Sequence, residues 1–199
     1  MMPPGHPRSI LPRETKRAYF ALCLLAVAVR IGLSNWGDAV KCGDSEHYLY
    51  GLHFSAVQLL RYDCDRWFNR TAGYVLFSRF AGLEQPIHAS DLSNLAAFQI
   101  FASVSTLAIL LALGPSLFQS RLISLALWAL FAFAVSMSEF VFPYENLLVP
   151  ENIGACLLLL AYALLFRRAR ASAAPMSTAL KCALLAICLS MMYTKEGLI

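Results

Sequence analysis

Long apolar runs separated by short polar segments dominate the chain. The runs lie at residues 18–36, 95–113, 122–141, 153–166 and 180–193. The first three approach the ~20 residues that an α-helix needs to cross a bilayer, and the fourth does so when extended by its flanks. Gly114 and Pro115 are expected to end the second run. The pattern predicts an all-α, polytopic membrane protein with about five transmembrane helices.

A polar segment, 38–92, separates the first two runs and contains two shorter helical patterns. In the first, at 43–62, one helical face carries Leu49, Leu52, Ala56, Leu59 and Leu60, and the other largely carries Glu46, His53, Gln58 and Arg61. The second pattern, at 71–83, is too short to span a bilayer. Amphipathic helices of this length lie on a membrane, so we expect two interfacial helices in this first loop.

Charge predicts how the chain is oriented. Only 14% of residues are charged and 59% are hydrophobic, whereas soluble domains carry about 25% charged residues. The basic residues gather as Arg8, Arg13, Lys16 and Arg17, and as Arg167, Arg168, Arg170 and Lys181. The segment 139–151 contains Glu139, Glu145 and Glu151 and has no Lys or Arg. The positive-inside rule therefore makes 1–17 a cytoplasmic basic tail and 38–92 an extracytoplasmic loop. With few aromatic residues between them, the basic clusters do not indicate a nucleic-acid partner.

Three ionisable residues, Asp44, Glu46 and His47, open the first amphipathic pattern. A carboxylate such as Asp44 beside a membrane could act as a general base, taking the proton of an attacking hydroxyl. An aspartate before an amphipathic run is also a helix N-cap, and the two roles are compatible. His47 and His53 are not four residues apart, so a zinc site is not predicted.

Other groups leave alternatives open. Asp63 and Asp65 could bind a divalent cation or form a solvated turn, and no other cofactor is expected. Cys42 and Cys64 could form a disulfide outside the cytoplasm or remain free thiols.

Arg30, near the end of the first run, could clamp an anionic head group together with Lys195. Each of these two cations could instead snorkel to the interface.

Several short motifs resemble those of a known enzyme superfamily. They are AVRIGL with Arg30, DSEHY from Asp44 to Tyr48, NRTAGYVLF with Gly73 and Tyr74, LLVPENIG with Pro150 and Glu151, and the pair Thr194 and Lys195. In order and sidedness they resemble the N-terminal portion of the GT-C membrane glycosyltransferases. That superfamily includes the dolichyl-phosphate-mannose protein mannosyltransferases and the RgtA-like sugar transferases.

The resemblance implies a function on the extracytoplasmic face. A sugar would pass from a polyprenyl-phosphate donor to a hydroxyl of an acceptor glycan, lipid or protein. Asp44 would be the catalytic base, without a metal ligand set. The substrate-binding residues would be Tyr48, Glu46, His47, Tyr74, Glu151, Lys195 and Arg30. Residues 18–199 would form an incomplete GT-C-like transmembrane domain of the bacterial inner membrane, its active loop facing the periplasm. The alternatives are a transporter or flippase subunit for a lipid-linked substrate, or an inactive truncated membrane remnant.

Overall fold

The computed structural model describes 12–37, 40, 45–61, 72–117, 122–138, 141–142, 147 and 151–170, with short pieces at 178, 181–182 and 184–187. Within these residues the secondary structure is helical. Its one extended feature is an isolated parallel bridge between Val40 and Leu147. The prediction of an all-α fold is confirmed.

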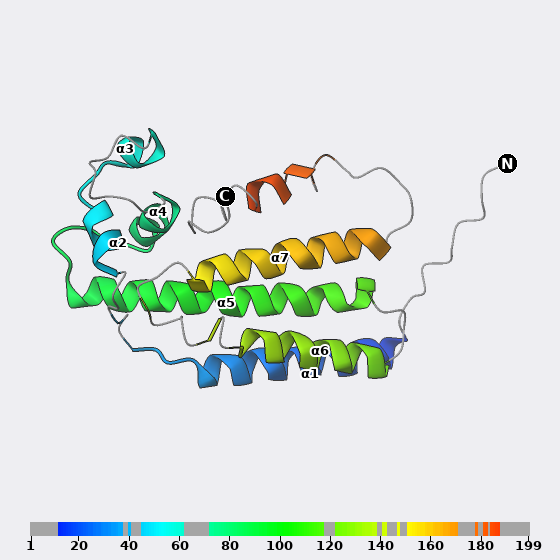
Figure 1. The fold of residues 1–199 in the computed structure, drawn as a ribbon. Helices are drawn as coiled ribbons and strands as arrows, with labels where there is room; N and C mark the ends of the chain where they lie inside the picture. The colour runs from blue at the N-terminus through cyan, green and yellow to red at the C-terminus, as the bar shows by residue number, and fades with distance from the viewer. Residues whose placement is uncertain are drawn as a thin grey trace.

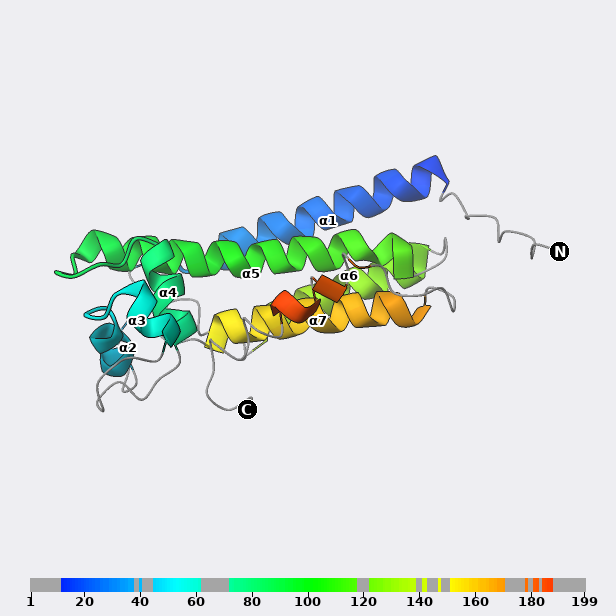
Figure 2. The same ribbon diagram turned by 90° about the horizontal axis from the view of Figure 1, so that it is seen from above.

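Four long helices lie side by side as a bundle (Figure 1, Figure 2). They are α1 (Arg13–Leu33), α5 (Ala89–Leu117), α6 (Leu122–Ser136) and α7 (Glu151–Arg170). Helix α5 packs against the other three, and α1 also packs against α6. Each helix of the bundle runs opposite to the one before it (Figure 1). Consequently α1 and α6 finish, and α5 and α7 begin, at one end, which we call the loop end.

Three short helices sit at the loop end: α2 (Ser45–Gly51), α3 (Ala56–Arg61) and α4 (Ala72–Phe80). The prediction of a single amphipathic helix at 43–62 is wrong, because the helix is interrupted at 52–55, between α2 and α3. The apolar face expected for it is also divided. Its leucines 49, 52 and 59 are buried, whereas Leu60 is exposed.

The break between α2 and α3 has identifiable causes. The backbone N–H of Ser55 donates to Oε1 of Gln58 at 2.8 Å, and the N–H of Gln58 donates to Oγ of Ser55 at 3.2 Å. This reciprocal pair is a capping box, which starts a new helix at α3. Arg79 of α4 donates to the carbonyls of Leu52, at 2.7 Å, and Phe54. The break is therefore fixed both locally and by α4.

Helix α4 falls within the predicted pattern at 71–83 and ends in a Schellman motif. The N–H of Leu83 donates to the carbonyl of Ser78, and the N–H of Gly82 to that of Arg79, both at 2.9 Å. Gly82 has φ +91°, a left-handed conformation that glycine adopts without strain. Leu83 is thereby turned into the interior, where it is buried with Tyr74 and Leu95.

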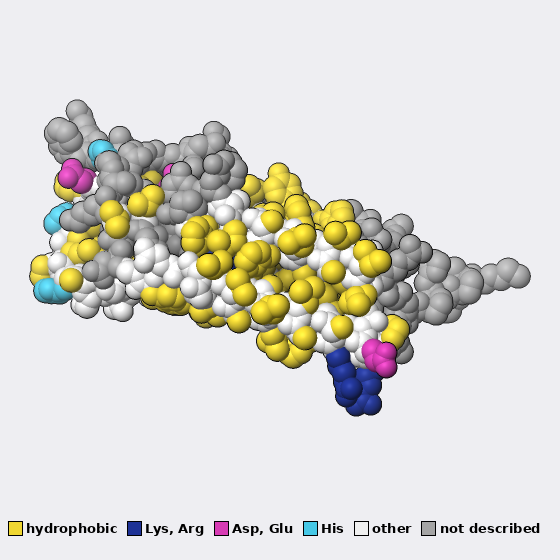
Figure 3. Space-filling view, turned by 90° about the horizontal axis from the view of Figure 1, so that it is seen from below, with side chains coloured by type: hydrophobic (Ala, Val, Ile, Leu, Met, Phe, Trp, Pro, Cys, Tyr) yellow, Lys and Arg dark blue, Asp and Glu magenta, His cyan; other side chains and the backbone are white. Residues whose placement is uncertain are grey.

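The surface of the bundle is largely apolar. Large side chains point outward along it, including Phe20 of α1 and Ile123 and Leu130 of α6, which are 64%, 76% and 64% exposed. Figure 3 shows this apolar surface over the middle of the bundle, with Lys and Arg side chains next to an acidic side chain at one end, and His and acidic side chains at the other. We call the first of these the basic end. Its exposed cations are Arg13, Lys16, Arg17 and Arg167.

One helix in the described part of the chain, Ala89–Pro115, is long and apolar enough to cross a membrane, and Leu122–Ser136 is a shorter apolar helix. Five transmembrane spans are not established. Helix α1 carries charges in its first turns and at Arg30, and α6 has only 15 residues. The predicted run at 180–193 lies mostly outside the described residues.

Pro115 does not end α5, contrary to the sequence-based expectation. The helix continues through it to Leu117. Proline has no N–H to give to the carbonyl four residues earlier, which is that of Leu111. The hydroxyl of Tyr19, on α1, donates to this carbonyl at 2.6 Å. A side chain from α1 thus replaces the hydrogen bond that α5 lacks, and the proline is tolerated.

Gly114 is what lets Tyr19 come this close to α5. A Cβ at position 114 would collide with the Tyr19 hydroxyl and would lie 2.8 Å from Cδ1 of Trp128. We expect Gly114→Ala to lower the unfolding free energy in detergent micelles by about 1–3 kcal/mol, because the contact is overpacked. The measurement is thermal unfolding, monitored by size-exclusion chromatography.

Gly154, on α7, provides the matched control for this substitution. A Cβ there meets nothing within 4 Å. Gly154→Ala should be neutral or stabilising, since alanine is the better helix former. Equal stability of the two variants would contradict the requirement for glycine at position 114.

Candidate functional site at the loop end of the bundle

Helix α5 carries a buried polar stripe, formed by Gln99, Ser103 and Thr106. Their exposed fractions are 0%, 1% and 4%. Spacings of four and three residues place them on one helical face. Buried polar groups in an otherwise apolar helix need partners, so the stripe shows where the bundle interior is polar. The sequence analysis missed these residues, although their spacing within the apolar run at 95–113 is the signal that identifies them.

The side chain of Arg30, on α1, contacts this stripe at Ser103. Its side chain is fully buried, with Nη1 donating to Oγ of Ser34 at 2.6 Å and Nη2 donating to Oγ of Ser103 at 3.2 Å. The guanidinium carbon also lies 5.0 Å from the centre of the Phe142 ring, within cation–π range. The alternative that Arg30 snorkels to the interface is therefore wrong. The serine hydroxyls draw the side chain inward.

The two serines hold the guanidinium in a defined position. Oγ of Ser34 donates to the carbonyl of Arg30 at 3.1 Å, and Oγ of Ser103 donates to that of Ile100 at 3.0 Å. Each hydroxyl thus gives its hydrogen to a backbone carbonyl and offers its lone pairs to Arg30. Arginine stays protonated in proteins. The structure places a fixed positive charge inside the bundle near the loop end.

A second polar chain begins about one helical turn away, at Gln99. The hydroxyl of Tyr74 donates to Oε1 of Gln99 at 2.7 Å, and Nε2 of Gln99 donates to the carbonyl of Leu147 at 3.0 Å. Tyr48 of α2 packs edge-to-face on Tyr74, with ring centres 5.1 Å apart. Two predicted site residues, Tyr48 and Tyr74, are thus brought together. Both are buried, and they connect α2 and α4 to α5.

The beginning of α7 closes this side of the site. Asn152 is fully buried, and its Nδ2 donates to the carbonyl of Val141 at 3.0 Å. Glu151, another predicted site residue, is half-buried in the first turn of α7, with one carboxylate oxygen inside the protein. A carboxylate there interacts favourably with the helix dipole. Because Phe142 contacts Arg30, the short segment 141–142 links Arg30 to the start of α7.

Of the remaining predicted site residues, the two that the structure describes are not brought into this cluster. Glu46 and His47 are exposed on α2. Asp44 and Lys195 lie outside the described residues, although Asp44 directly precedes Ser45, which is fully buried at the start of α2.

Two further sequence hypotheses also fall outside the described residues. They are the Asp63 and Asp65 pair and the disulfide between Cys42 and Cys64. In the part that the structure describes, no group of three or more His, Cys, Asp or Glu side chains could hold a metal ion. The described cluster is built from arginine, hydroxyls, amides, aromatic rings and the Glu151 carboxylate.

This arrangement can influence a ligand through electrostatics. The Arg30 guanidinium has no open surface, so its influence on a ligand at the loop end would be exerted through the field of its positive charge and not by direct contact. Inside an apolar bundle such a field is screened far less than in water. A positive charge in such a position stabilises negative charge that is placed near it.

Comparisons with models of known protein families, with curated proteins and with solved structures find no match to this chain.

Proposed function

We propose that the chain is a multi-pass integral membrane protein with its basic end in the cytoplasm. The apolar exterior of the bundle supports this, because soluble monomers rarely expose such continuous apolar surface. The gathering of Arg13, Lys16, Arg17 and Arg167 at one end supports the orientation. The loop end then faces the extracytoplasmic side, which would be the periplasm of a bacterial inner membrane.

We further propose that the chain belongs to a glycosyltransferase that uses a polyprenyl-phosphate sugar as donor. The observation that carries this proposal is the buried charge of Arg30 at the end of the bundle where α2 begins, directly after Asp44. Charged residues inside membrane bundles are costly and usually functional. A fixed cation inside the bundle, together with a carboxylate that directly precedes α2 in the sequence, would suit a reaction that expels an anionic phosphate and removes a proton.

The proposed reaction is a displacement at the anomeric carbon of the sugar. The acceptor hydroxyl oxygen forms a bond to this carbon while the bond from the carbon to the phosphate oxygen breaks, with inversion. Asp44 takes the hydroxyl proton, and the polyprenyl phosphate leaves with the bonding electrons. Arg30 stabilises the negative charge that develops on this leaving group. Glu46, His47, Glu151 and Lys195 remain proposed substrate-binding residues, and Tyr48 and Tyr74 position α2.

Reconstituted full-length protein would test this function. Proteoliposomes receive polyprenyl phosphate bearing a radiolabelled hexose or pentose, or the matching nucleotide sugars, together with a lipid or glycan acceptor. We expect label to reach the acceptor only from the lipid-borne donor. Transfer from nucleotide sugars would overturn the proposal, as would movement of the labelled lipid across the bilayer without transfer, which would identify a flippase.

A further inference from the structure

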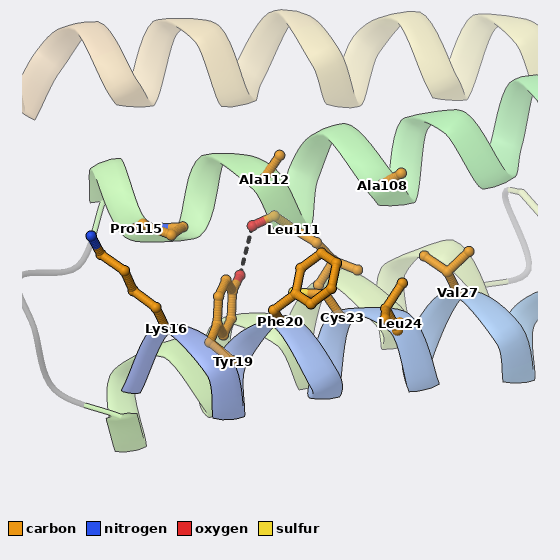
Figure 4. A pocket seen from close by; sticks show the side chains of 10 residues that line it. All are labelled: Lys16, Tyr19, Phe20, Cys23, Leu24, Val27, Ala108, Leu111, Ala112 and Pro115. Atoms are coloured by element: carbon orange, nitrogen blue, oxygen red, sulfur yellow. Dashed lines mark hydrogen bonds between the residues drawn. The ribbon is translucent and has the colours of Figure 1, made fainter. Parts of the chain in front are cut away.

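A groove runs along the outside of the bundle between α1 and α5, close to the basic end (Figure 4). Its volume is about 480 Å³, in the range of pockets that hold small molecules. Apolar side chains line most of it, among them Phe20, Leu24 and Val27 of α1 and Ala108 and Ala112 of α5. Lys16 stands at one end. The groove therefore combines a long apolar floor with one positive charge.

We propose that this groove binds an anionic glycerophospholipid, with one acyl chain against α1 and α5 and the phosphate of the head group beside Lys16. This inference rests on the membrane location proposed above. It concerns a different lipid from the sugar donor, because Lys16 and helix α2, which Asp44 precedes in the sequence, belong to opposite ends of the bundle and would face opposite leaflets.

Charge complementarity selects the head group. Lys16 is exposed one helical turn before Phe20 and is flanked by the exposed cations Arg13 and Arg17, with Glu14 as the nearby acid. Basic residues at the membrane surface attract anionic lipids. Two other described grooves, between α6 and α7 and between α1 and α6, are lined without charged residues. Of these grooves, the one ending at Lys16 can distinguish an anionic lipid from a neutral one.

Native mass spectrometry of the full-length protein tests this proposal independently of sugar transfer. Micelles are doped equally with phosphatidylglycerol and phosphatidylcholine of the same acyl chains. We expect the wild type to retain phosphatidylglycerol about fivefold more than phosphatidylcholine, the effect of one interfacial cation. Lys16→Gln should remove most of this preference, leaving only the weaker attraction of Arg13 and Arg17. Arg61→Gln, the same charge change on exposed α3 at the loop end, should leave it unchanged.

A second pair of variants tests the acyl chain. Ala108→Phe fills the groove and should abolish retention of both lipids, whereas Ala134→Phe, at an exposed alanine of α6 outside the groove, should not. The proposal is overturned if the wild type shows no preference for phosphatidylglycerol or if Lys16→Gln keeps that preference. Lipid retention unchanged by Ala108→Phe overturns it too. A wild type that retains neither lipid also overturns the proposal. That result is expected if a second copy or another part of the chain covers the groove.

Discussion

Replacing Asp44 by Asn is expected to lower the rate of sugar transfer by about 10²- to 10⁴-fold, the contribution typical of a positioned general base. Asparagine keeps the shape of the side chain but cannot accept the proton of the acceptor hydroxyl. It can still cap a helix. Folding of α2 should therefore survive while turnover is lost. The measurement is transfer of labelled sugar in proteoliposomes, alongside thermal unfolding of the same preparations.

Asp91→Asn is the matched control for this substitution. Asp91 lies in the first turn of α5, and its Oδ2 accepts a hydrogen bond from the N–H of His88 at 2.9 Å. Its replacement should change stability slightly and leave transfer intact. Unchanged turnover in Asp44→Asn would remove the assignment of Asp44 as base and leave it only a capping role.

Arg30→Met is expected to reduce transfer by about tenfold, less than the 10²- to 10³-fold cost of removing a directly hydrogen-bonded donor, because Arg30 acts only through the field of its charge. Methionine keeps much of the side-chain volume at position 30, so the packing should largely be preserved while the charge is lost. Both Ser34 and Ser103 would keep their hydrogen bonds to backbone carbonyls. Loss of activity without loss of stability is thus the expected signature.

Two further variants separate charge from shape at this position. Arg30→Lys keeps the charge but lacks the two-pronged geometry that reaches both serines, so it should restore transfer only in part. Thr106→Val removes a hydroxyl from the same polar stripe; within the described residues this hydroxyl donates to the carbonyl of Ala102 in its own helix. That control should remain active. An Arg30→Met protein that is unstable yet fully active would make Arg30 a structural residue.

Hydrophobic periodicity accounts for much of the fold. It predicted an all-α chain, the positions of the long helices and the placement of α4. The sequence also contains a local signal for the interruption between α2 and α3. Ser55 and Gln58 have the spacing of a capping box, which predicts that a new helix begins after Ser55.

The contacts of the candidate site depended on partners far apart in the sequence. Whether Arg30 turns outward or inward is decided by Ser103, on another helix. The passage of α5 through Pro115 similarly depends on Tyr19, 92 residues away from the carbonyl it satisfies. Local propensity contains no information about such pairings. It therefore gave the wrong outcome for Pro115 and left two alternatives open for Arg30.

The hydrogen bond from Tyr19 to Leu111 also bears on biogenesis. A nascent α5 released alone into hydrocarbon would carry an unsatisfied carbonyl, at a cost that lipid cannot offset. Since α1 emerges from the ribosome first, it is already available to supply the missing donor. In the membrane protein proposed above, lateral exit of α5 from the translocon should therefore be coupled to its docking on α1, and loss of the Tyr19 hydroxyl should delay that exit.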